Sequence, residues 1–97
     1  MSKIRQLKVA AQIFRLLNEI LITEEVLFET FSNLLIVDVK MTDGLKEAKV
    51  YFTTTNSSNA NYNRILQDFH SFFRSKIASN LQLKVTPRLI FEKVKQS

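Results

Sequence analysis

Apolar residues recur at intervals of three and four through the first part of the chain, which is the spacing of one face of an α-helix. These residues are Ile4, Leu7, Val9, Ala10, Ile13, Leu17, Ile20 and Leu21. Ser2 stands just before them, and its hydroxyl can accept a hydrogen bond from a backbone N–H of the first turn. We therefore predict an amphipathic helix over residues 3–21.

The opposite face of this helix is expected to be basic. Its polar residues are spaced three, four and three apart, and they are Arg5, Lys8, Gln12 and Arg15. This spacing places them in one stripe along the helix. The stripe is either an ordinary solvated face or a row of contacts to phosphates, and it contains no acidic residue, which favours the second interpretation.

Two later segments alternate apolar and polar residues with the period of two that is typical of a strand with one buried face. In residues 34–41 the buried face is expected to hold Leu35, Val37, Val39 and Met41. In residues 46–54 it is expected to hold Ala48, Val50 and Phe52. The turn between them, residues 42–44, contains the only glycine, Gly44, which we expect to adopt a positive φ. The two strands would form a hairpin.

The segments on either side of this hairpin are less regular. Residues 23–33 carry Val26, Leu27 and Phe31, which fit either a short helix or an apolar loop over the edge of the sheet. Residues 53–63 are rich in Thr, Ser and Asn, so we predict a surface loop that ends by capping the next helix.

A second helix is predicted from Tyr62 to Asn80, and a last strand over residues 82–94. The helix would bury Ile65, Phe69, Phe72, Phe73, Ile77 and Leu81. Residues 68–71 are weaker helix formers, so the helix could either bend there or continue straight, and the sequence does not decide between the two. One face of the strand would hold Leu83, Val85, Leu89 and Phe91, and the other Lys84, Thr86, Arg88 and Ile90.

This order, helix, strand, strand, helix, strand, predicts an α+β fold with helices on one face of a three-stranded sheet. We expect one domain over residues 1–97. The other face of the sheet would be open to solvent and would show Lys40, Lys49, Tyr51, Lys84 and Arg88.

Composition narrows the possible functions. The 97 residues are 45% hydrophobic, which is enough for one core, and they include no cysteine, which excludes disulfides and thiol chemistry. Fourteen Lys and Arg against nine Asp and Glu leave a net charge of +5, which favours a polyanionic partner. No apolar run approaches the roughly 20 residues that cross a bilayer, and no secretion signal is visible, so we expect a cytoplasmic protein without a membrane partner.

The residues that could support catalysis are few. His70 is the only histidine, and it has no cysteine and no pair of carboxylates at ligand spacing around it, so we expect no metal. Asp68, His70 and Ser71 are neighbours on a helix and point in different directions, so they cannot form a catalytic triad. One glycine cannot build a phosphate-binding loop. We expect no enzymatic activity, no cofactor and no small-molecule substrate.

Two RNA-binding modules have a comparable size and a similar mix of helices and strands, and neither signature is present. A KH domain clamps the RNA backbone with a GXXG loop, and an RRM stacks bases on aromatic side chains of its sheet. Tyr51 is the only aromatic residue that we expect on the open face. Recognition of RNA would therefore depend on shape and phosphates.

Three stretches of the chain resemble the ribosome-binding factor A family. Lys8-Val9, with Ile13, Leu17, Ile20 and Leu21, resembles its opening Arg-Val-x-x-x-Ile pattern and its Ile-Leu close. Leu45 followed by residues 48–52, AKVYF, resembles its Asp-Leu-x-x-Ala-Lys-Val-Tyr-Val. The most specific match, to its Ile-Arg and then Leu-x-Leu-Arg-x-x-Pro-x-Leu-x-Phe, is carried by Phe73-Arg74, Leu81, Leu83-Lys84, Pro87, Leu89 and Phe91.

The chain also departs from the family pattern. Phe69-His70-Ser71 stands where the family bends its helix at Ala-Ser-Gly, and Gly44 stands in place of an Asp. The Asp-Pro-Arg after the first helix is missing around Leu27 to Glu29, and Val94 replaces an Asp near an end that lacks the family's carboxyl extension. We expect a divergent, shortened member.

The resemblance implies a KH-like domain of the type II order without a GXXG loop. It implies a monomeric bacterial factor that binds the immature small ribosomal subunit and its rRNA and assists rRNA maturation without catalysis. It carries over Lys8, Arg74, Lys84 and the bend segment with His70 and Ser71 as RNA-binding positions. Charge placement adds Arg5, Arg15, Lys76 and Arg88. The alternative is a protein-interaction module that docks a partner through the apolar segment 26–31.

Overall fold

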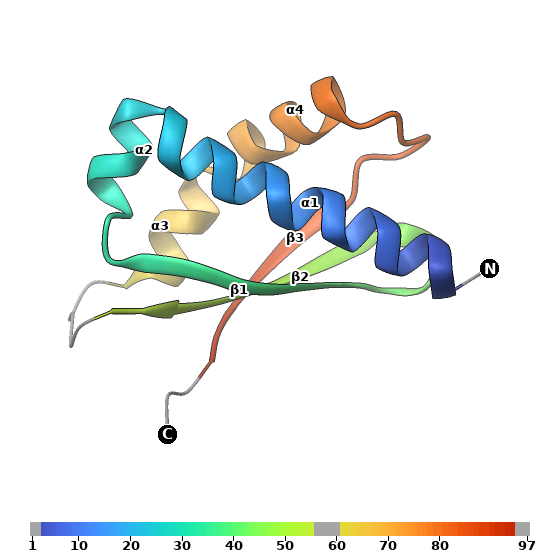
Figure 1. The fold of residues 1–97 in the computed structure, drawn as a ribbon, viewed down its shortest axis with the longest axis horizontal. Coiled ribbons are helices and arrows are strands. Elements are labelled where there is room, and N and C mark those ends of the chain that lie inside the picture. The colour runs from blue at the N-terminus through green and yellow to red at the C-terminus, as the bar shows by residue number, and fades with distance from the viewer. Residues whose placement is uncertain (1–2, 56–60, 95–97) are drawn as a thin grey trace.

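The computed structural model describes residues 3–55 and 61–94, which form five helices and three strands (Figure 1). In chain order they are α1 (Lys3–Thr23), α2 (Glu25–Thr30), β1 (Leu34–Met41), the short 3-10 helix η1 (Asp43–Leu45), β2 (Glu47–Thr54), α3 (Tyr62–Asp68), α4 (His70–Asn80) and β3 (Arg88–Lys93).

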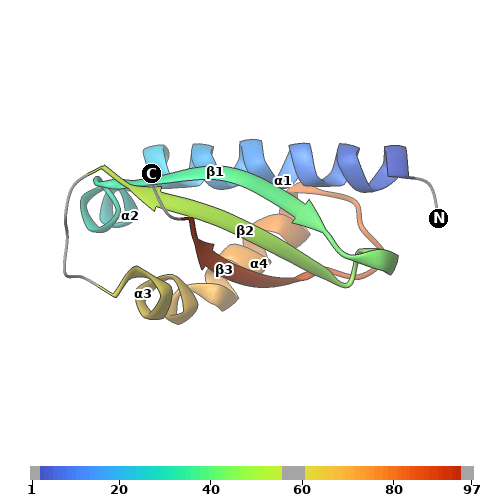
Figure 2. The same cartoon turned by 90° about the horizontal axis from the view of Figure 1, so that it is seen from below.

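The three strands form one mixed sheet in the order β1-β2-β3. β1 and β2 are antiparallel and form the predicted hairpin, whereas β2 and β3 are parallel. A parallel pair needs a crossover, and α3 and α4 supply it. The helices lie on one side of the sheet, and the view from below shows its other side uncovered (Figure 2). The predicted α+β architecture is confirmed.

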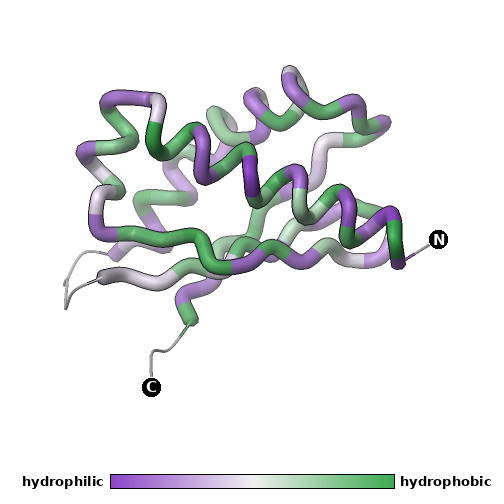
Figure 3. Tube along the Cα trace, in the orientation of Figure 1, coloured by the Kyte–Doolittle hydropathy of each residue, from purple (hydrophilic) through white to green (hydrophobic). Residues whose placement is uncertain are grey.

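The core lies between α1, α4 and the central strand. α1 alternates hydrophobic and hydrophilic residues along its length (Figure 3), and its buried residues are Val9, Ala10, Ile13, Leu17, Ile20 and Leu21. These match the predicted face, so the first helix is confirmed. On β2, Ala48, Val50 and Phe52 are fully buried, as expected for a central strand with one covered face.

The predicted buried face of β1 is wrong in its first half. Leu34 and Ile36 are buried there, whereas Leu35 and Val37 are 52% and 43% exposed. The cause is a β-bulge, because Ile36 pairs with Phe52 while Asp38, two residues later, pairs with the next residue, Tyr51. The extra residue shifts the phase of the alternation by one. Val39 is therefore buried again after the bulge.

The turn between β1 and β2 behaves as predicted. Gly44 has a φ of 75°, and Leu45 follows it with a φ of 57°. The side chain of Leu45 is nevertheless buried, which compensates for the unusual backbone of a residue with a Cβ atom.

The two irregular segments differ from each other in outcome. Residues 25–30 form the short helix α2, which buries Leu27 and leaves Val26 and Phe28 exposed. The loop predicted over residues 53–63 begins later than expected, because Thr53 and Thr54 are buried members of β2. Residues 56–60 lie outside the described residues. Asn61 caps α3 as predicted by accepting a hydrogen bond from the backbone N–H of Arg64 at 3.2 Å.

The second predicted helix is divided at Phe69, which decides between the bent and the straight form that its sequence allows. α3 ends at Asp68, Phe69 has φ −95° and ψ 9°, and α4 begins at His70. The predicted buried stripe is correct at Phe73 and Ile77 and partial at the other positions. The buried residues of α3 are Tyr62 and Leu66, because the bend turns α3 relative to α4.

The predicted last strand is too long. Only residues 88–93 pair with β2, and residues 81–87 form an irregular connection in which Val85 is 66% exposed. Lys84 lies in this connection, so its predicted place on the open face of the sheet is wrong. Pro87 stands directly before the first paired residue, a position that tolerates proline in an edge strand. The carbonyls of Thr86 and Pro87 bond to the Arg74 side chain.

Candidate nucleic-acid interface

The basic stripe of α1 borders an open groove. The groove has a volume of about 710 Å³ and lies between the N-terminal half of α1 and the C-terminal end of α4. Its lining residues are Ile4, Arg5, Lys8, Val9 and Gln12 from α1, and Asn80, Leu81, Gln82 and Leu83 from the end of α4 and the connection after it. Lys84 follows directly and is exposed.

Charge is distributed unevenly along α1. Arg5, Lys8 and Arg15 are exposed, and within residues 3–55 and 61–94 none of them forms a salt bridge. Four of the nine acidic residues of the chain lie at the opposite end of the helical layer: Glu19, Glu24, Glu25 and Glu29. The part of α1 before Glu19 therefore presents unbalanced positive charge, which is where a phosphate backbone would be attracted.

Lys76 belongs to the acidic end. Its Nζ lies 3.4 Å from the Glu24 carboxylate and 5.5 Å from the centre of the Phe72 ring. Both members of the ion pair are partly exposed, so the pair contributes at most about 1 kcal/mol.

Arg74 is bound inside the protein. Its Nη2 donates to the carbonyl of Thr86 at 2.9 Å, and its Nε donates to the carbonyl of Pro87 at 3.3 Å. A guanidinium is a fork of donors that suits two neighbouring acceptors. Arg74 therefore fastens α4 to the residues that lead into β3.

His70 makes a second link from α4, this time to β3 itself. Its Nε2 accepts a hydrogen bond from the backbone N–H of Leu89 at 3.0 Å, which requires this nitrogen to be unprotonated. Burial, and then the charges of Arg74 and Arg88, hold the pKa of His70 below its usual value of 6.5. A neutral imidazole gives little attraction to phosphate. Ser71, the next residue, is exposed in the first turn of α4.

Two of the basic residues predicted on the open face of the sheet have partners there. Arg88 is paired with the carboxylate of Glu47 on the neighbouring strand. Lys40 lies 5.9 Å from the centre of the Tyr51 ring, and Tyr51 pairs in turn with Glu92. Arg88 and Lys40 therefore have partners, in contrast to the basic residues of α1.

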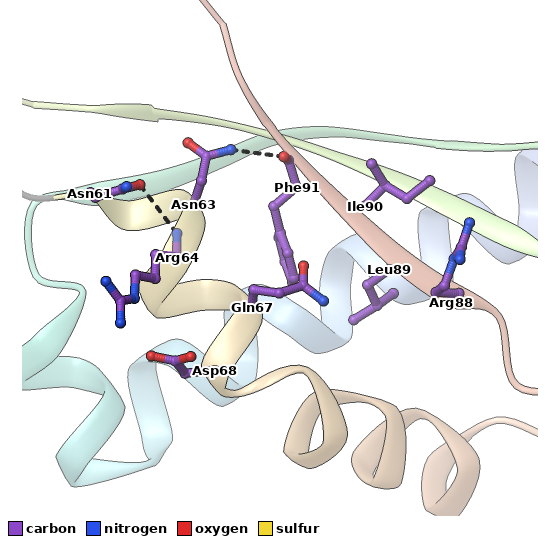
Figure 4. A pocket seen from close by; sticks show the side chains of 9 residues that line it. All are labelled: Asn61, Asn63, Arg64, Gln67, Asp68, Arg88, Leu89, Ile90 and Phe91. Carbon is purple, nitrogen blue, oxygen red and sulfur yellow. Dashed lines mark hydrogen bonds between the residues drawn. The ribbon is translucent and has the colours of Figure 1, made fainter.

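A second groove, of about 550 Å³, lies between α3 and β3 (Figure 4), and sequence reasoning missed it. Its lining residues are Asn61, Asn63, Arg64, Gln67, Asp68, Arg88, Leu89, Ile90 and Phe91. Asn63 donates to the Phe91 carbonyl at 2.9 Å, as Figure 4 shows. The amides in this stretch resembled capping residues in the sequence, and nothing there indicated that α3 would lie against β3.

Backbone groups of β3 face this groove. The N–H groups of Arg88 and Val94 donate to β2. Along a strand the backbone N–H and C=O groups of successive residues point to opposite sides, so those of Leu89 and Phe91 point away from β2. His70 takes the N–H of Leu89, and Asn63 takes the C=O of Phe91. The carbonyl of Leu89 and the N–H of Phe91 lie between these two links.

Metal sites and membrane-spanning helices were also searched for in the described part of the chain. Residues 3–55 and 61–94 contain no group of three or more His, Cys, Asp or Glu side chains placed to hold a metal ion. A search of the same residues finds no helix that is long and apolar enough to cross a membrane.

The order of elements, the mixed three-stranded sheet and the bent helix pair define a KH-like domain. The family model described as ribosome-binding factor A matches residues 5–96. The chain therefore belongs to the ribosome-binding factor A family.

Curated relatives and solved structures agree with this assignment. Ribosome-binding factor A of Thiobacillus denitrificans is 38% identical over 89 residues, which cover 90% of this chain and 71% of the relative. Its counterpart in Ruthia magnifica is 37% identical over 60 residues, which cover 62% of this chain and only 54% of the relative.

Two solved structures resemble the fold. Ribosome-binding factor A of Thermus thermophilus has a TM-score of 0.76 at 20% identity, covering 91% of this chain and 93% of that one. A Thermotoga maritima protein described as a candidate ribosome binding factor A has a TM-score of 0.77 at 26% identity, covering 98% and 92%. The first likeness is evidence for the fold alone.

Proposed function

We propose that this protein is a non-catalytic assembly factor that binds the immature small ribosomal subunit as a monomer in the cytoplasm, contacts its rRNA and assists the maturation of that rRNA. Binding would act by favouring one conformation of the RNA over another. Membership of the family supports association with the ribosome. The role of the small subunit and of its rRNA is our inference.

The observation that supports RNA binding most strongly is the unbalanced positive charge beside the groove of α1. Arg5, Lys8 and Arg15 form one exposed row, and Lys84 is exposed directly after Leu83, which lines the groove on the side opposite α1. RNA phosphates would release counterions on binding such a row, which gives affinity without reading a sequence. We assign the main contacts with RNA phosphates to these four residues.

The remaining predicted positions have a weaker claim. Arg74 bonds to the connection that precedes β3, and His70 bonds to β3 itself. Lys76 is paired with Glu24, and Arg88 with Glu47. Their role in RNA binding stays a prediction. A bound phosphate would have to compete with an internal partner at each of them.

Sedimentation with purified small subunits tests the proposal. A triple variant, Arg5→Glu, Lys8→Glu and Arg15→Glu, should lose most of its association with free small subunits. It should also reduce the slope of log affinity against log salt by about 2 to 3, since each phosphate contact contributes roughly 0.7 to 0.9.

A matched control replaces three other basic residues, Lys46, Lys49 and Lys93, by glutamate and so changes the net charge by the same amount. This control should retain more affinity than the α1 variant. Equal losses in the two variants would show that total charge matters and the α1 row does not. Equal binding of the native chain to unrelated RNA would indicate a general nucleic-acid binder.

Docking of a protein through residues 26–31 is a weaker candidate function. Val26 and Phe28 are exposed, which suits a docking surface, but Leu27 and Phe31 are buried in the core. Association through this segment would be insensitive to salt and would survive the α1 charge reversal.

A further inference from the structure

The outer edge of β1 and the N-terminal half of α1 enclose an apolar groove, here called the α1/β1 groove. β1 is an outer strand of the sheet, and in the view from below the N-terminal half of α1 lies beyond its edge (Figure 2). Two hollows, of about 310 and 410 Å³, lie between them and share Leu7, Ala10 and Val39. The α1/β1 groove is thus continuous, and it faces away from the basic groove beside α4.

The side chains that line the α1/β1 groove are mainly apolar. Those with apolar side chains are Leu7, Ala10, Ala11, Phe14, Val37, Val39 and Met41. Leu7 is 70% exposed although it lies in the middle of an apolar surface, and the β-bulge turns Val37 outward beside it. Contiguous apolar surface of this kind commonly marks a site for a partner.

The backbone of β1 determines what kind of partner fits. Thr42 donates its backbone N–H to the carbonyl of Glu47 on β2. Backbone groups alternate in direction along an antiparallel strand, so those of Lys40 also point toward β2, whereas those of Val39 and Met41 point away from it. The N–H of Val39 is taken by the Asp38 carboxylate at 2.9 Å. The carbonyl of Val39 and both polar groups of Met41 remain directed at the α1/β1 groove. Groups spaced in this way are matched by the backbone of another extended strand.

Charge adds a direction to the α1/β1 groove. Lys3 and Lys40 line its end near Met41, and Gln6 closes that end by donating to the Asp43 carboxylate at 3.3 Å. Asp38 is the acidic residue in the lining, and it lies toward the other end. An occupant with a carboxylate near Lys3 and Lys40 would complement this arrangement.

We infer that the α1/β1 groove binds an extended segment of a partner protein as a fourth strand beside β1. The segment carries apolar side chains at alternate positions, which pack under Leu7 and Ala11, and an acidic side chain that reaches Lys3 and Lys40. The bulge ends regular pairing at Val37, so the bound stretch is about five residues long, at about 3.4 Å per residue.

A second copy of this chain fits less well than a single strand. Pairing of two β1 strands about Lys40 would place like charges directly opposite each other. It would also bring two α1 helices together, and helices need 8–10 Å between their axes, about twice the spacing of paired strands. α1 already lies beyond the edge of β1, so the space beneath it suits a strand without a helix of its own.

A display library of random ten-residue peptides tests this inference without assuming a sequence. The 97-residue chain is used as bait, and Leu7→Glu and Ile22→Glu serve as paired variants. Both residues are exposed positions on α1, at 70% and 69%, but only Leu7 lines the α1/β1 groove. Peptides enriched by the native chain should alternate apolar residues, contain an acidic residue, bind Ile22→Glu unchanged and bind Leu7→Glu at least tenfold more weakly.

Nuclear magnetic resonance then locates the enriched peptide. Its addition should shift the amide of Met41 and protect it from hydrogen exchange, and a version of the peptide with N-methylated backbone on the pairing edge should not bind. The inference fails if no peptide with alternating apolar residues is enriched, or if Leu7→Glu and Ile22→Glu bind the enriched peptide equally well. It also fails if the peptide shifts amides outside the α1/β1 groove and not that of Met41. It also fails if Met41 shifts with the concentration of the chain alone, since the occupant would then be a second copy.

Discussion

Replacing Arg74 by methionine removes the charged group that holds the connection between α4 and β3, while it keeps most of the apolar length of the side chain. The side chain is half-buried and donates to two carbonyls, those of Thr86 and Pro87, at 2.9 and 3.3 Å. Hydrogen bonds from a charged donor contribute about 1.5–3 kcal/mol each when intact, and the longer of these two belongs at the low end. Water can partly replace the guanidinium, so we expect the free energy of unfolding to fall by about 2–3 kcal/mol.

Urea denaturation followed by circular dichroism measures this loss. Lys76→Met is the matched control, because it removes a cation from the same helix whose ion pair with Glu24 is exposed. The control should change the free energy of unfolding by less than about 1 kcal/mol. A loss below 0.5 kcal/mol for Arg74→Met, on the order of ordinary surface substitutions, would refute the structural role that we assign to Arg74.

Arg74→Lys separates that structural role from a contact with RNA. Lysine keeps the positive charge but cannot reach two carbonyls with one fork of donors, so it should lose part of the stability. A phosphate contact would need mainly the charge. If folded Arg74→Lys binds small subunits normally while folded Arg74→Met does not, Arg74 contacts RNA directly.

Three further predictions concern His70, Gly44 and Val37. Because the pKa of His70 is lowered in the folded protein, its contribution to stability is present above pH 6.5 and is lost as the pH falls through 6.5 toward the folded pKa. The urea midpoint should therefore decrease from pH 7.5 to pH 5.5, and it should decrease less in His70→Gln. Gly44→Ala should lower the free energy of unfolding, measured in urea, by about 1 kcal/mol because φ is 75°, and the new Cβ would meet only the Lys46 side chain at 3.8 Å. Gly44→Asn should recover part of this loss, because asparagine tolerates a positive φ better. Deletion of Val37 should preserve the circular dichroism spectrum and cost little stability, because it removes the bulge and leaves Leu34, Ile36 and Val39 in one unbroken alternation.

Most helices and strands could be predicted because their periods are clear, and the failures have local causes. Residues 34–37 are all apolar, so their periodicity fits either face, and the bulge after Ile36 decides which one is buried. The pattern of residues 82–94 continues through Pro87, although the paired strand begins only after it. In both places the sequence pattern is continuous and the hydrogen bonding is not.

The candidate site was predictable where it depends on one helix and not where it depends on distant residues. The row of Arg5, Lys8 and Arg15 follows from helical spacing alone. The partners of the second groove are separated by 28 residues for Asn63 and Phe91, and by 19 for His70 and Leu89. No local pattern reveals such pairs, because they form only when α3 and α4 pack against β3.

The bend at Phe69 forms without a glycine at or beside it. Phe69 has a negative φ, so the bend needs no residue that tolerates a left-handed backbone. Its ring lies 5.9 Å from that of Phe31 and 6.3 Å from that of Phe73, and His70, the next residue, is bonded to β3. Aromatic packing and one hydrogen bond thus hold the two helices at their angle. Because the groove between α3 and β3 is positioned by the same contacts, its shape depends on the core of the protein and not on a flexible hinge.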